Sequence, residues 1–144
     1  MGTRSLTVIC NEDGSEIAVL YRQYDGHPRW HGQELANFLK GRPICNGFLR
    51  ADVQKRAFNG AGCLAAQIVG HFKMSIYNPI GGFYLHAAGT RDCGEEFIYT
   101  VRPTGGGKIR LTCNDIERDV FDGDPADFNG EQIEALSPAP GVQS

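Results

Sequence analysis

The sequence predicts an α+β domain in which a mainly antiparallel sheet carries two helices on one face. Five short segments alternate apolar and polar residues, as half-buried strands do. Two longer segments repeat apolar residues every three or four positions, which is typical of amphipathic helices. Most connections between the strands have the length of hairpin turns, which favours antiparallel pairing. The expected element order is β-β-α-α-β-β-β.

The first two strands are predicted at residues 5–10 and 16–24, joined by the turn sequence NEDGSE. Alternation along the second strand places Arg22 and Tyr24 on the same face. These residues therefore form a β-hairpin whose second strand ends in polar and aromatic side chains.

Two helices follow the hairpin. Residues 32–41 carry Leu35, Phe38 and Leu39 on one side and end at a glycine. In residues 59–73, apolar side chains recur four positions apart, at Leu64, Ile68 and Phe72. Each helix thus has one apolar face with which to cover the sheet.

Three further strands are predicted at residues 81–89, 95–103 and 108–115. Their alternation is regular, with Phe97, Tyr99 and Val101 on one face of the middle strand. The pattern therefore completes a five-stranded sheet.

The C-terminal part of the chain is acidic and turn-rich over residues 117–136, where one short helix is expected. Residues 137–144 have the composition of a flexible tail. With no linker or internal repeat, residues 1–136 are expected to form one domain.

Composition narrows the class of protein. The 144 residues are 41% hydrophobic and 22% charged, close to the globular average. A net charge of −3 argues against duplex nucleic acid as a partner, because such proteins usually carry a basic surface. No signal peptide or membrane span is recognisable, which predicts a cytosolic protein, in the host-cell cytosol if a phage encodes it.

Cysteine and histidine spacing predicts neither a metal nor another cofactor. The five cysteines are scattered without a C-x-x-C pair, as reduced and mostly packed thiols are. His31 and Glu34 have a spacing seen in metal-binding helices, but two ligands do not make a metal site.

The stretch YRQYDGHPRWHG, residues 21–32, is the densest group of polar and aromatic side chains. Arg22, Tyr24 and Asp25 are candidate ligand contacts, since an arginine fork binds phosphate and an aromatic ring stacks on a base. The alternative is a solvent-facing edge on which Arg22 pairs with an acidic residue. His31 is a candidate hydrogen-bonding residue, and the candidate general acid or base if the protein is an enzyme.

Two other places are candidates for ligand contacts. Asn59 and Gly60 precede a helix whose N-terminus attracts anions, although a turn and close packing explain these residues equally well. A nucleophilic role for the nearby Cys63 has no support, because the sequence places no base beside it. Arg91 lies in a loop between strands and is a further candidate contact. The run GGGK at 105–108 is not a P-loop, because a strand rather than a helix follows it.

The chain resembles a family of small bacteriophage and bacterial proteins. The resemblance rests on MGTRSLT at the start, on YRQYDG followed by HGQELANFL, on NGAGCLAAQIVGHFK and on IGGFYLHAAGTRDCGEEFIYTV. The family usually has tyrosine in place of His27 and a small residue in place of Trp30. Arg22, Tyr24, Asp25 and His31 match its motif.

The resemblance implies an accessory, anti-defence role. We expect a homo-oligomer that binds and sequesters a nucleotide-derived immune signal, such as a cyclic nucleotide or an ADP-ribose derivative. One alternative is a metal-independent phosphodiesterase that cleaves such a signal, with His31 as acid or base and Arg22 stabilising phosphate charge. A module that blocks a host protein is the other alternative.

Overall fold

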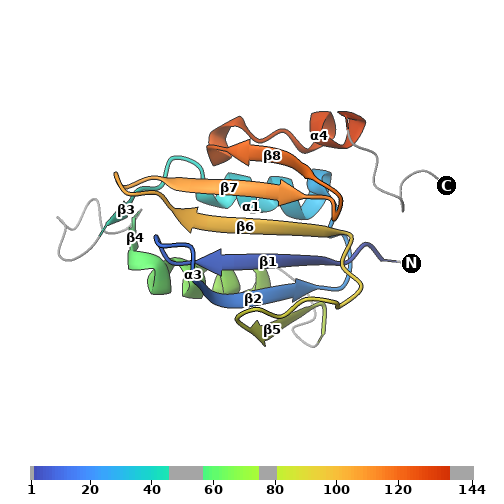
Figure 1. Ribbon diagram of the computed structural model, residues 1–144, viewed down its shortest axis with the longest axis horizontal. Helices are drawn as coiled ribbons and strands as arrows, with labels where there is room; N and C mark the ends of the chain where they lie inside the picture. The colour runs from blue at the N-terminus through green and yellow to red at the C-terminus, as the bar shows by residue number, and fades with distance from the viewer. Residues whose placement is uncertain (1, 46–56, 75–80, 137–144) are drawn as a thin grey trace.

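A six-stranded sheet organises the protein (Figure 1). The computed structural model describes residues 2–45, 57–74 and 81–136, so the predicted tail at 137–144 lies outside the described residues. In spatial order the strands of the sheet are β5 (Phe83–Ala87), β2 (Glu16–Arg22), β1 (Ser5–Cys10), β6 (Phe97–Pro103), β7 (Ile109–Asn114) and β8 (Asp119–Gly123). All neighbouring pairs are antiparallel except β1 and β6, which confirms the mainly antiparallel α+β prediction.

The connection between β5 and β6 differs from the expected hairpin. Both strands run in the same direction, and β2 and β1 lie between them. Residues 88–96 therefore cross the sheet instead of turning back beside β5. Cys93 from this connection packs against a cluster on one sheet face formed by Leu6, Val8, Cys10, Val19 and Tyr21. The crossover thus covers part of the face that the helices leave open.

Strand β8 was not expected from the sequence. It lies in the acidic segment that predicted only turns and a helix, and Asp119 and Asp122 interrupt its apolar pattern. Asp122 holds Arg110 of β7 through two hydrogen bonds, of 2.5 and 2.7 Å. Cross-strand pairing of opposite charges therefore replaces apolar alternation on this edge strand.

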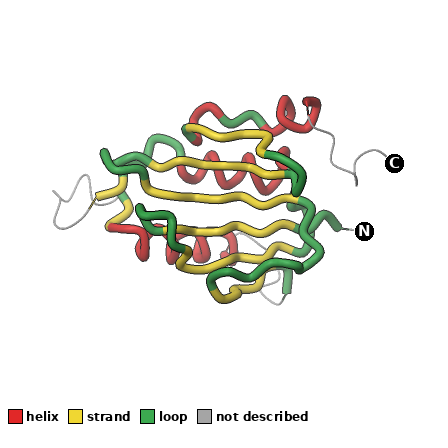
Figure 2. Tube along the Cα trace, viewed as in Figure 1, coloured by secondary structure: helices red, strands yellow, loops and turns green. Residues whose placement is uncertain are grey.

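The two main helices lie on one side of the sheet, as Figure 2 shows. They are α1 (Gln33–Leu39) and α3 (Gly60–Met74), at the positions that the sequence predicts. A π-helical turn, η1 (Pro28–Gly32), leads into α1. The C-terminal segment adds the 3₁₀ turn η2 (Pro125–Asp127) and α4 (Gly130–Leu136). A two-stranded parallel pair, β3 (Ile44–Cys45) and β4 (Phe58–Asn59), lies at one end of the sheet.

The main core lies between the helices and the sheet. Leu35 and Leu39 of α1 and Ile68 and Phe72 of α3 are fully or almost fully buried there. They pack against the inward face of β6 and β7, at Phe97, Tyr99, Val101, Ile109, Leu111 and Cys113. Within the described residues, no helix is long and apolar enough to cross a bilayer.

Tyr99 joins the core to the polar turn before η1. Its ring is fully buried, and its hydroxyl donates a hydrogen bond of 2.8 Å to the carbonyl oxygen of Gly26. Burial raises the pKa of this hydroxyl well above its usual value, which keeps the hydroxyl a donor. The bond gives a buried carbonyl a partner that solvent cannot supply.

We expect Tyr99→Phe to lower the free energy of unfolding by about 1–3 kcal/mol, because the Gly26 carbonyl loses its buried donor. Equilibrium urea unfolding measures the change. The matched control is Tyr24→Phe at a 59% exposed ring, which should change stability by less than about 0.5 kcal/mol. Equal effects of the two substitutions would contradict this role of Tyr99.

Candidate ligand cavity

The structure places His31 in the core, away from solvent. Its ring is fully buried and stacks on Phe72 at a centroid distance of 4.5 Å. Nε2 lies 2.6 Å from the hydroxyl oxygen of Thr7, and Nδ1 lies 3.2 Å from Nη1 of Arg22. In this conformation neither ring nitrogen is available to a substrate.

The partners of His31 determine its protonation. A guanidinium only donates, so Nδ1 accepts from Arg22 and the proton lies on Nε2, which donates to Thr7. Burial lowers the pKa of His31 well below its ordinary value, and the Arg22 charge lowers it further. His31 is therefore a neutral imidazole that joins β1, β2 and η1.

Arg22 is occupied by internal contacts. Its side chain is 14% exposed, and its Nη1 lies 3.5 Å from the Glu34 carboxylate. Nε donates to the carbonyl oxygen of Tyr24, and the guanidinium lies over the Phe83 ring at 4.9 Å. Of the two interpretations of Arg22, the geometry therefore fits pairing with a glutamate, but inside the fold and not on a solvent-facing edge.

The other two predicted ligand contacts of residues 21–32, Tyr24 and Asp25, are exposed, unlike Arg22 and His31. Tyr24 lies beyond the end of β2 with an exposed ring, which packs where a β-carbon of Gly2 would lie. Asp25 is exposed and adopts a positive φ of 60°, while its carbonyl accepts from the His31 amide. Arg22 and His31 are brought together, whereas Tyr24 and Asp25 do not join them in a pocket.

Arg91 is also paired. Its guanidinium makes hydrogen bonds of 3.3 and 2.8 Å with the two carboxylate oxygens of Glu16, at the start of β2. These bonds lower the pKa of Glu16 and raise that of Arg91. The pair links β2 to the crossover.

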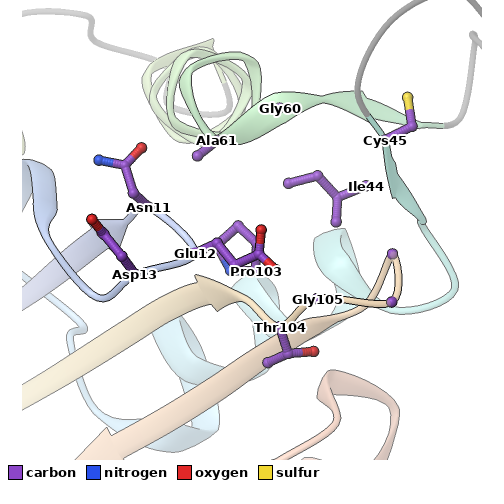
Figure 3. Close-up of a pocket in the computed structure, with 12 residues that line it drawn as sticks. Asn11, Glu12, Asp13, Ile44, Cys45, Gly60, Ala61, Pro103, Thr104 and Gly105 are labelled. Atoms are coloured by element: carbon purple, nitrogen blue, oxygen red, sulfur yellow. The ribbon is translucent and has the colours of Figure 1, made fainter.

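A cavity of about 540 Å³ lies at the end of the sheet opposite to Arg22 and His31, where β1 and β6 end and α3 begins. Figure 3 shows four segments facing one another around it. They are the β1–β2 turn, the β3 strand, the first residues of α3 and the β6–β7 loop, and they contribute Asn11, Glu12, Asp13, Ile44, Cys45, Gly60, Ala61, Pro103, Thr104, Gly105, Gly106 and Gly107. The volume is in the range of small-molecule sites.

Gly60 is the one predicted contact in this lining, and Asn59 immediately precedes it at the end of β4. Gly60 has a φ of +83°, which a side chain would make unfavourable. The predicted contact at the start of this helix therefore lies at a cavity. Cys63, in the next turn, accepts a hydrogen bond of 3.2 Å from Gln67.

Sequence reasoning missed the other walls of the cavity. Asp13 accepts hydrogen bonds from the amide and hydroxyl of Ser15, at 2.9 and 2.6 Å, so its carboxylate is used within the turn. Glu12 is exposed, and its Oε1 lies 2.7 Å from where a β-carbon of Gly105 would be. Its carboxylate thus lies against the glycine loop, residues 105–107, at the edge of the cavity.

The conformation of the glycine loop requires glycine at two positions. Gly106 and Gly107 have φ values of +115° and +78°, and the loop is closed by the Thr104 amide donating to the Lys108 carbonyl at 2.9 Å. The Ile44 amide donates to the Gly107 carbonyl at 3.0 Å, which attaches the loop to β3. The run GGGK, which is no P-loop, therefore forms a wall of this cavity.

No protein-family model matches the chain, no curated protein matches its sequence, and no solved structure matches its fold. These comparisons therefore indicate no function. Among those residues, no group of three or more histidine, cysteine, aspartate or glutamate side chains is placed to hold a metal ion.

We expect His31 to make stability depend on pH. Its pKa in the folded protein lies below 6.5, the value of an unperturbed histidine, so below that pH the unfolded chain binds the proton that the folded protein excludes. The free energy of unfolding should therefore fall as pH decreases from 7.5 to 5, and less steeply in His31→Gln.

Urea unfolding of both proteins across this pH range measures the difference. If His31→Gln does not fold, the ring signals of His31 in wild-type NMR spectra supply the same answer, because they should remain those of a neutral imidazole at pH 5.5. A folded-state protonation near pH 6.5 would contradict the assignment.

Proposed function

We propose that this protein binds a small nucleotide-like molecule, without turnover, in the cavity of about 540 Å³. The observation that carries the proposal is the lining itself. The Glu12 carboxylate, for which the described residues supply no ion-pair partner, lies beside glycine backbone in a lining that also includes the first residues of α3. Carboxylates accept hydrogen bonds from ribose hydroxyls and amino groups, and glycine permits close approach of a ligand to the backbone.

The distribution of ionisable groups supports binding over hydrolysis. A phosphodiesterase needs a general acid or base that reaches the substrate. His31, the candidate for that role, is fully buried with both nitrogens engaged. Glu12 is a carboxylate in the cavity, but the described residues that line it include no histidine, lysine or arginine to stabilise charge on a phosphate during cleavage. Retention of an intact ligand therefore fits the geometry better than cleavage.

The resemblance to phage proteins supplies the biological part of the proposal. A protein that holds a nucleotide-derived signal, such as a cyclic nucleotide or an ADP-ribose derivative, would keep that signal from its receptor. The same proposal includes a homo-oligomer, because a pocket between subunits would add side chains from a second copy. Size-exclusion chromatography with light scattering, with and without ligand, measures the oligomeric state.

The test is mass spectrometry of small molecules released by denaturing protein purified from its host. We expect one nucleotide-like compound at a defined ratio to the chain, recovered intact after prolonged incubation. Time-dependent conversion of the added compound would favour the enzyme. A host protein in place of any small molecule would favour the blocking module.

We further expect Glu12→Gln to weaken binding of the recovered compound by about tenfold, because an acceptor charge is lost. Isothermal titration calorimetry measures the affinity. Glu117→Gln is the matched control, since Glu117 is an exposed glutamate in the β7–β8 turn at the opposite end of the sheet. Unchanged affinity in Glu12→Gln would place the ligand outside this cavity.

A further inference from the structure

Arg42 is held in an unusual environment just after α1. Its guanidinium carbon lies 4.5 Å from the ring centroid of Phe38 and 5.6 Å from that of Phe58. The amide of Arg42 donates to the Leu39 carbonyl at 3.2 Å, which closes the end of the helix. The side chain is half-buried, so the two rings fix the position of its charge.

No carboxylate neutralises this charge within the part of the chain that the structure describes. By contrast Arg22, Arg29, Arg91 and Arg110 each have a carboxylate oxygen within 3.5 Å. Partial burial of an unpaired charge is unfavourable. Stacking uses the flat face of a guanidinium and leaves its N–H edge available for a planar, two-bond contact with an oxyanion.

Arg42 lines a second cavity of about 470 Å³. Lys108 adds another positive charge, and Leu39, Pro43, Ile109 and Pro125 supply apolar walls. Asp124 also lines it, but its carboxylate accepts a hydrogen bond of 2.8 Å from the Ala126 amide and caps η2. The formal charge of the lining is therefore positive.

The two cavities adjoin. Gly106 and Gly107 line both, so the glycine loop separates a compartment that contains Glu12 from one that contains Arg42 and Lys108. One molecule with hydroxyl or amino donors at one end and an oxyanion at the other would match the two compartments.

We propose that the second cavity is an oxyanion site in which Arg42 and Lys108 bind a phosphate group. The identity of the larger ligand rests on the proposed function, whereas the site for phosphate does not. In the nucleotide-like ligand, the phosphate contacts Arg42 and Lys108 while the sugar or base faces Glu12 across the glycine loop.

The probe for this site is inorganic phosphate, followed through the arginine Nε–H signals in NMR spectra of ¹⁵N-labelled protein. We expect a saturable shift of the Arg42 signal, and an affinity for phosphate that is at least about tenfold weaker in Arg42→Gln. Lys108→Gln should weaken phosphate binding as well. The matched control is Arg102→Gln, an exposed arginine on β6 that lines neither cavity and should leave phosphate binding unchanged.

Three outcomes separate this inference from the proposed function. Phosphate bound at Arg42 with no nucleotide-like compound recovered would support the site and count against the function. A recovered compound whose affinity is unchanged in Arg42→Gln and Lys108→Gln would support the function and overturn the placement of that compound's phosphate at Arg42 and Lys108. A non-saturable shift, or an equal loss in Arg102→Gln, would overturn the site. If Arg42→Gln fails to fold, the phosphate affinity of Lys108→Gln and the shift of the Arg42 signal in the wild-type protein still test the site.

Discussion

The hydrogen bond from the partly buried Arg22 to the fully buried His31 is the interaction on which the arrangement of β1, β2 and η1 depends. It joins the end of β2 to the π-helical turn that begins α1, and the bond from His31 to Thr7 adds β1. An unsatisfied polar group in this position would cost several kcal/mol, so the contacts form together or not at all. They fix where α1 begins, and Arg42 of the second cavity follows three residues after α1 ends at Leu39.

The two ends of the sheet differ in how their polar groups are used. At the end near Arg22, the Arg22 and His31 side chains have protein partners in Thr7, the Tyr24 carbonyl and Glu34. At the opposite end, short strands and a glycine loop replace large side chains, and two cavities remain. Backbone with positive φ at Gly106 and Gly107 is what allows the loop to stand between the two cavities.

Local sequence patterns were sufficient for most elements but not for their pairing. Alternation located β1, β2, β5, β6 and β7, and the four-residue repeat located α3. The parallel pairing of β1 with β6 joins residues about ninety positions apart, for which a local pattern carries no signal. The site residues were harder to predict than the fold. In a sequence, an arginine that binds a ligand looks the same as one that pairs with a carboxylate inside the protein. Arg22 finds Glu34, and Arg91 finds Glu16 across 75 positions, only once the chain is folded.

A stretch of sequence that is rich in polar and aromatic side chains therefore need not offer them to a ligand once the chain is folded. In the stretch from Tyr21 to Gly32, Arg22 and His31 belong to a polar network that removes them from solvent, whereas Tyr24, Asp25 and Trp30 are exposed but line neither cavity. Among the described residues at the two cavities, the groups on which the proposals depend are the Glu12 carboxylate, the stacked Arg42 guanidinium, Lys108 and the glycine loop. In the proposal, this set contacts opposite ends of one polar molecule, and because cleavage also needs a placed acid and base beyond the groups that bind the ligand, the proposal favours capture over cleavage.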